Sequence, residues 1–219
     1  MKRMPILLLS LLVNLSTTHA QKIPVPFISL STGTFIISHE DFKKVYDSNA
    51  GLAFAGNLGF PLTNNAFIFG RVTKFQKEGV PVFMRFDIID GEPANIEQYR
   101  EGDASFSELM LSAGAQYNFR LNSNSLLGLN FGITSLRLFE EHHTSEGNLA
   151  WEMEGKGLSS IFLGSAFEYK LNNQPFSLIV DASYDYAFKE IIAYMGDYGG
   201  LSFTAGLRYY LNILAPKGE

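Results

Sequence analysis

Large apolar residues alternate with small or polar ones in several separate segments of this chain, and this two-residue period constrains its fold most strongly. The clearest examples are residues 51–62 and 201–211, where every second position is mainly leucine, phenylalanine or tyrosine. Successive side chains of a β-strand point to opposite faces, so each segment has one apolar face. About ten residues is the length of a tilted strand that crosses a hydrocarbon layer. Eight such strands are expected, at residues 27–37, 51–62, 66–75, 109–121, 127–138, 161–171, 178–188 and 201–211.

The connections between these strands alternate between short and long. The short ones are rich in asparagine, which tolerates the left-handed backbone of tight turns. They contain Thr63-Asn64-Asn65, Asn122-Ser123-Asn124 and Asn172-Asn173-Gln174, whereas the long ones span residues 39–49, 76–105, 139–157 and 189–199. This order is typical of barrels in the outer membrane. The sequence therefore predicts an all-β fold, an eight-stranded antiparallel up-and-down transmembrane β-barrel with short periplasmic turns and long external loops.

Residues 1–20 have the pattern of a signal peptide. Lys2 and Arg3 precede an apolar run at residues 6–13, and Thr18-His19-Ala20 forms a small-residue cleavage site. The run is too short for a transmembrane helix, which needs about 20 residues. We expect export, removal of residues 1–20, and a single barrel domain at residues 21–219.

Charge and composition exclude several classes of function. The chain has no cysteine, so disulfides and thiolate metal sites are excluded. Without Lys2 and Arg3, 15 basic and 22 acidic residues remain, a net charge of −7 that argues against a nucleic-acid partner. No spacing of serine, histidine and carboxylate indicates nucleophilic catalysis. We expect neither enzymatic activity nor a cofactor.

The strand face opposite the large apolar residues carries charges of both signs. An eight-stranded barrel has an interior just wide enough to be filled by side chains. These charges are therefore expected to pair in a network that plugs the lumen, with a narrow ion path or proton relay as the alternative. The predicted lumen residues are Glu108, Arg120, Glu168, Lys170, Asp181, Asp185 and Arg208.

An aromatic residue recurs near the end of four strands that lead into the same side of the predicted barrel. Membrane barrels carry aromatic girdles at both interfaces with water. We expect a periplasmic girdle made of Phe60, Phe119, Tyr169 and Tyr209.

The last predicted strand carries the most local family signature. Its sequence Thr204-Ala205-Gly206-Leu207-Arg208-Tyr209-Tyr210-Leu211 is similar to the signal read by the barrel assembly machinery. Together with the strand pattern, it resembles the outer-membrane β-barrel domain family, the small barrels of the OmpA and OmpX type. The resemblance implies a location in the bacterial outer membrane, with lipid and the assembly machinery as partners, the latter through residues 204–211.

Two other classes of function stay open at this stage. A soluble periplasmic β-barrel that binds a small apolar ligand would turn Leu52, Phe54, Phe60 and Leu207 inward. A lipid- or peptide-modifying enzyme active at the barrel rim would draw on the loop histidines, His39, His142 and His143. The leading expectation is instead a structural or surface-interaction role.

The long loops contain further features without a firm assignment. Glu140-Glu141-His142-His143 has metal-ligand chemistry, but adjacent histidines on a strand point to opposite sides, so we expect no metal site. Residues 76–105 mix apolar and acidic residues and are expected either to cap the barrel or to contact an unidentified surface partner. Phe42 and Tyr46 would share one face of a helical turn. The strand at 66–75 is ambiguous in its orientation.

Overall fold

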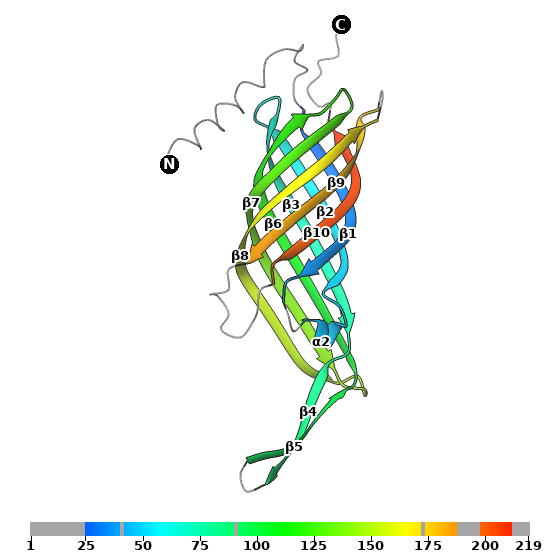
Figure 1. The fold of residues 1–219 in the computed structure, drawn as a ribbon, viewed down its shortest axis with the longest axis vertical. Coiled ribbons are helices and arrows are strands. Elements are labelled where there is room, and N and C mark those ends of the chain that lie inside the picture. Colours follow the sequence, from blue (N-terminus) through cyan, green and yellow to red (C-terminus); the bar gives the residue numbers. More distant parts are fainter. Residues whose placement is uncertain (1–24, 40–41, 90–91, 172–173, 188–197, 212–219) are drawn as a thin grey trace, which may run out of the picture.

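The computed structural model describes residues 25–39, 42–89, 92–171, 174–187 and 198–211, and these form a closed barrel of eight antiparallel strands (Figure 1). The order around the barrel is β1-β10-β9-β8-β7-β6-β3-β2, and β1 closes the circle by pairing with β10. The barrel strands are β1 (Phe27–Ile37), β2 (Ala50–Pro61), β3 (Ala66–Gly79), β6 (Asp103–Arg120), β7 (Ser125–His143), β8 (Leu149–Lys170), β9 (Phe176–Ala187) and β10 (Gly200–Tyr210). The predicted fold class is confirmed. The expected signal peptide lies outside the described residues.

The two ends of the barrel differ, as the spacing of the strands predicts. At one end, here called the short-turn end, tight turns join β2 to β3 and β6 to β7 (Figure 1, top). β8 ends and β9 begins at the same end, but Asn172 and Asn173 of the third predicted turn lie outside the described residues. Asparagine stabilises one of them directly: Oδ1 of Asn122 accepts hydrogen bonds from the backbone N–H groups of Asn124 and Ser125, at 2.9 and 2.8 Å. We call the opposite end the long-loop end.

Strands at the long-loop end continue well beyond their predicted bounds. β3 reaches Gly79, β6 begins at Asp103, and β7 and β8 run on to a turn at residues 144–148, so much of the two predicted long loops is strand. The prediction missed these extensions because the outward face becomes polar there and the contrast between faces is lost. A separate two-stranded sheet, β4 (Val82–Ile89) and β5 (Glu92–Arg100), projects past the barrel (Figure 1, bottom).

The large apolar side chains of the barrel wall point outward. Leu52, Phe54, Phe60 and Leu207 are 49–55% exposed, whereas Ala53, between two of them, is fully buried. This contradicts the alternative of a barrel that lines its interior with these residues. The ambiguous strand is also oriented: in β3 the phenylalanines Phe67, Phe69 and Phe75 are buried in the lumen, and Ile68 and Val72 are exposed on the outside.

An apolar cluster fills the lumen at the long-loop end. Phe35, Phe75 and Phe106 are fully or almost fully buried there. The short helix α2 (Phe42–Tyr46) packs onto them, with the rings of Phe42 and Tyr46 stacked at 4.3 Å between centroids. The two residues thus share one face, as their spacing predicts. Within the described part of the chain, no helix is long and apolar enough to cross a membrane.

Candidate functional site

A buried ion pair occupies the lumen near the short-turn end. Nη1 of Arg208 donates to Oε2 of Glu168 at 2.7 Å, and the hydroxyl of Tyr210 donates to the other carboxylate oxygen at 2.6 Å. Nη2 of Arg208 lies 3.4 Å from Oε1 of Gln116, and its guanidinium carbon lies 3.9 Å from the ring centroid of Phe27. These side chains come from strands on several sides of the barrel, so they cross-link its wall through the lumen.

A second pair lies further along the lumen, centred on Arg71 of β3. Nη2 of Arg71 lies 3.2 Å from Oδ2 of Asp181 on β9, and Nε donates to Oδ1 of Asn57 at 2.7 Å. Asn130 on β7 donates to the same carboxylate of Asp181 at 3.1 Å. The guanidinium also lies over the rings of Phe69 and Phe162, at 5.5 and 5.6 Å. This network joins β2, β3, β7 and β9 across the interior.

Two further acidic residues lie between this network and the apolar cluster at the long-loop end. Oδ1 of Asp185 accepts a hydrogen bond from Thr134 at 3.0 Å, and Thr134 is within 2.9 Å of the hydroxyl of Ser112. Glu108 is completely buried, and neither of its carboxylate oxygens has a hydrogen-bond partner among the described residues. A buried carboxyl group without a partner lowers stability.

The predicted lumen residues are distributed unevenly. Glu108, Glu168, Asp181, Asp185 and Arg208 are buried in the interior. The remaining two behave differently: Nζ of Lys170 lies 5.5 Å from the ring centroid of Tyr210, whereas Arg120 is exposed at the short-turn end of β6.

Sequence reasoning missed Arg71, the partner of Asp181. The strand could not be oriented from sequence because three phenylalanines lie on the same face as Arg71. In the sequence, an apolar aromatic face that points into the lumen looks the same as one that points outward. The residues Ile68, Gly70 and Val72 on the opposite face could have shown the orientation. An aliphatic face is typical of the outside of this barrel, and it would have placed Arg71 inside.

The predicted aromatic girdle residues lie near the short-turn end. Phe60 and Tyr169 are 49% and 42% exposed, and Phe119 and Tyr209 are partly exposed. Other aromatic side chains accompany them: the ring of Tyr209 lies 5.0 Å from that of Phe176, and the ring of Phe119 lies 4.9 Å from that of Tyr117.

At the long-loop end, two of the loop histidines, His39 and His142, contact aromatic residues. His142 lies 4.9 Å from Trp151, ring to ring, and its Nε2 is 2.9 Å from Oε1 of Glu140. The same carboxylate oxygen accepts a hydrogen bond from the hydroxyl of Tyr46 at 2.6 Å. Within the described residues, no group of three or more histidine, aspartate and glutamate side chains is arranged to hold a metal ion.

Two tyrosines at this end are held in their neutral form. Burial raises the pKa of Tyr46 well above its usual value, and the hydrogen bond to Glu140 raises it further. Burial also raises the pKa of Tyr198 to about 12, with the charges of Glu140 and Glu108 acting in the same direction. The ring of Tyr198 lies 5.2 Å from that of His39.

The projecting β4–β5 hairpin carries exposed apolar side chains and is anchored at its base. Arg100 donates to Oδ1 of Asp47 at 2.8 Å and to the backbone carbonyl of Val45 at 3.1 Å, which ties the base of β5 to the segment around α2. Among its described side chains, Met84, Ile88, Ile89 and Ile96 are the most exposed large apolar ones, at 53–71% exposure.

No protein-family model and no curated protein sequence matches this chain. Solved structures do match in fold, and the class that they define is the small outer-membrane β-barrel. The chain is thus an eight-stranded barrel with the OmpA/OmpX-like fold of that class.

Three of these structures show the extent of the similarity. Neisserial surface protein A has a TM-score of 0.57 and 14% identity, over 85% of this chain and 97% of that one. A major outer-membrane protein from Thermus thermophilus has a TM-score of 0.53 and 14% identity, over 88% and 100% of the two chains. The N-terminal barrel domain of OprF from Pseudomonas aeruginosa has a TM-score of 0.51 and 10% identity, over 85% and 96%.

Proposed function

We propose that this chain is a bacterial outer-membrane protein that is anchored by its barrel wall and presents its long-loop end to the exterior. The observation that carries the proposal is the outward apolar belt, in which residues such as Leu30, Phe131 and Leu163 are 60–71% exposed. A soluble protein rarely exposes so continuous an apolar surface. A closed barrel, by contrast, satisfies its backbone hydrogen bonds internally and can face hydrocarbon.

The two ends support one orientation in the membrane. Outer-membrane barrels have short turns on the periplasmic side and longer segments outside. In this orientation Phe60, Phe119, Tyr169 and Tyr209 form the periplasmic girdle, and residues 204–211, at the end of β10 and just beyond it, are recognised by the assembly machinery. The β4–β5 hairpin then extends outward from the cell surface.

The lumen in this proposal is a stabilising plug and not a channel. The Arg71–Asp181 pair crosses the interior from β3 to β9, the Arg208–Glu168 pair links β10 to β8 inside it, and the apolar cluster with α2 covers it at the long-loop end. Barrels of eight strands have an interior that side chains can fill. We therefore expect the protein to conduct no ions in a planar bilayer.

The role proposed for the protein is contact with a partner at the cell surface, without catalysis. The β4–β5 hairpin supports this role because it projects beyond the barrel, exposes isoleucine and methionine side chains, and is tied at its base by Arg100. Exposed apolar surface of this kind marks an interaction site more often than a polar, solvent-facing surface does.

Trypsin treatment of intact cells tests the orientation. Arg85 is exposed in the hairpin, so we expect cleavage there while the barrel stays in the membrane fraction. The variant Arg85→Gln is the matched control and should lose that fragment. Cleavage only after the outer membrane is permeabilised would contradict the orientation, and a soluble protein would contradict the anchor.

A further inference from the structure

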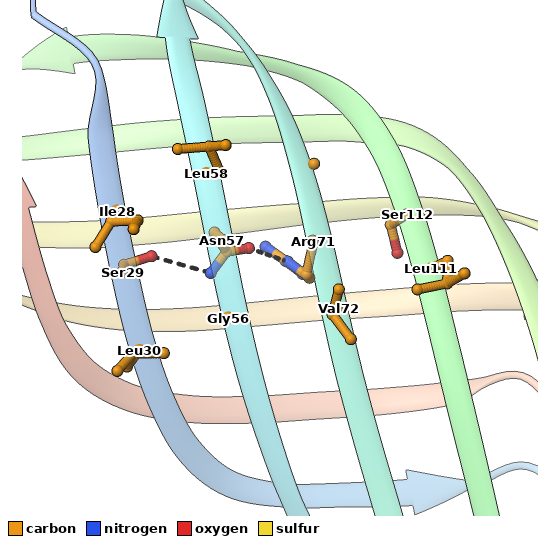
Figure 2. Close-up of a pocket in the computed structure, with 11 residues that line it drawn as sticks. Ile28, Ser29, Leu30, Gly56, Asn57, Leu58, Arg71, Val72, Leu111 and Ser112 are labelled. Atoms are coloured by element: carbon orange, nitrogen blue, oxygen red, sulfur yellow. Dashed lines mark hydrogen bonds between the residues drawn. The ribbon is translucent and has the colours of Figure 1, made fainter.

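A groove of about 510 Å³ indents the outer face of the barrel wall across β1, β2, β3 and β6. Two glycines line it, Gly56 on β2, which Figure 2 shows between Leu30 and Leu58, and Gly70 on β3. The aliphatic side chains around it are Ile28, Leu30, Leu58, Val72 and Leu111.

The internal packing of the barrel does not require these two glycines. A Cβ atom at Gly56 would meet only Cδ2 of Leu30, at 3.6 Å, and one at Gly70 would meet only a backbone oxygen of Ser112, at 4.0 Å. Neither glycine has a positive φ. By contrast, a Cβ atom at Gly33 would collide with the backbone of β10. Glycine within a strand lowers stability relative to alanine, so the two open positions are unfavourable for the fold and have the effect of keeping the groove open.

The groove offers a ligand no polar contact from its side chains. Asn57 donates to Oγ of Ser29 at 3.0 Å and accepts from Nε of Arg71 at 2.7 Å, on the lumen side of the wall (Figure 2). The backbone of the groove is already paired within the barrel sheet: Gly56 with Leu30 and Val72, and Gly70 with Leu58 and Ala113. An added peptide strand would find no free backbone N–H or C=O group in the groove with which to form ladder hydrogen bonds. The chemistry fits a hydrocarbon chain.

The position of the groove favours a lipid, and not a second copy of the protein, as its occupant. The groove is continuous with the apolar belt that faces lipid in the proposed function, and it lies on the half of β2 and β3 nearer the short-turn end. A twofold contact between copies places the same patch against itself, which would set groove against groove and leave a larger void. An acyl chain can instead lie along the floor and gain van der Waals contact with the aliphatic walls.

We propose that this groove binds one acyl chain of a membrane phospholipid. The proposal rests on the membrane insertion proposed above. In a bilayer the hydrophobic effect does not favour one apolar contact over another. Close packing of the acyl chain against the groove is therefore what favours its binding there. The site recognises the acyl chain of the lipid and not its headgroup. No charged side chain that lines the groove turns a polar atom toward the outside.

Counting retained phospholipids by native mass spectrometry tests the site. The full chain is released from nanodiscs of phosphatidylethanolamine, or of phosphatidylglycerol, with identical acyl chains. We expect the wild-type barrel to retain one phospholipid, equally for both headgroups. In Gly56→Leu/Gly70→Leu the groove is filled, and the population with one bound lipid should fall at least fivefold. Ala182→Leu, at an outward position on β9, is the matched control and should behave as wild type.

Each other outcome overturns the proposal in a distinguishable way. Equal lipid retention in all three proteins would show that the groove is not a site, although the barrel inserts. Retention of phosphatidylglycerol alone would indicate a headgroup site, and a dimer peak lost in the double variant would indicate a second copy. Failure of the wild type to enter nanodiscs would refute membrane insertion itself. The single variant Gly70→Leu, checked for folding by its gel mobility before and after boiling, should show a smaller loss in the same direction.

Discussion

Nη1 of Arg208 and Oε2 of Glu168 lie 2.7 Å apart, although their strands, β10 and β8, are separated by β9 in the barrel wall. The side chains are only 4% and 3% exposed. The ion pair therefore joins strands that make no ladder hydrogen bonds with each other, and it does so in a medium of low dielectric constant. Removing one partner leaves an uncompensated buried charge.

Arg208→Met is expected to lower the free energy of unfolding by about 3–5 kcal/mol, because it strands the carboxylate of Glu168 in the lumen. Urea unfolding of the protein in detergent measures the change. Arg137→Met is the control: its ion pair with Glu154 is at the surface, with Arg137 61% exposed, and its loss should cost about 0–1 kcal/mol. Equal losses in the two variants would contradict a buried network.

Gly33→Ala and Gly56→Ala are expected to change stability in opposite directions. A Cβ atom at Gly33 would collide with the carbonyl oxygen of Phe203, and overpacking of this kind costs about 1–3 kcal/mol. At Gly56 there is room, so alanine should stabilise the strand by about 0.5–1 kcal/mol. Denaturant midpoints of the two variants check this, and a loss at Gly56 as large as that at Gly33 would be inconsistent with the open groove.

Val180→Arg tests whether the outer face meets hydrocarbon. Val180 is 54% exposed on β9, in the middle of the apolar belt. An arginine near the bilayer midplane costs about 2–4 kcal/mol, whereas the same change on a water-facing strand costs little. Ile88→Arg, in the β4–β5 hairpin, is the control and should be neutral. The measurement is unfolding in lipid vesicles; neutrality of both variants would place the belt in water.

The stability of the folded chain should fall as pH rises from about 10 to 12. Tyr198 has a pKa of about 12 in the folded chain, and an unfolded tyrosine titrates near 10. Within this window the unfolded chain loses the proton while the folded one keeps it, so deprotonation favours unfolding, by up to about 2 kcal/mol. Tyr198→Phe should flatten this part of the profile relative to Tyr184→Phe, an exposed control. Parallel profiles would argue against the buried environment.

The strand pattern predicts the barrel because lipid-facing and lumen-facing positions impose opposite demands on alternate residues. Leu207 and Arg208 in β10 illustrate this, since one is exposed and the other buried. The same contrast assigns Glu168, Asp181 and Arg208 to the interior from sequence alone. The pattern is informative only where one face of a strand is apolar and the other is not.

The missed features lie where that contrast is absent. Arg71 shares a face with buried phenylalanines, so the sequence cannot show that it pairs with Asp181, 110 residues later. The outer faces of the β7 and β8 extensions are largely polar, and the long-range contact of Tyr46 with Glu140 depends on how α2 packs. The groove at Gly56 and Gly70 depends on neighbours from four strands, which only the register defines.

Heat modifiability on a gel decides whether this chain is a closed barrel in the outer membrane. The protein is expressed, the outer membrane is isolated, and unboiled and boiled samples are compared on a detergent gel. We expect a band in the outer-membrane fraction whose mobility changes on boiling, because a closed barrel keeps its fold in detergent until it is heated. Recovery as a soluble periplasmic protein with one mobility would contradict it.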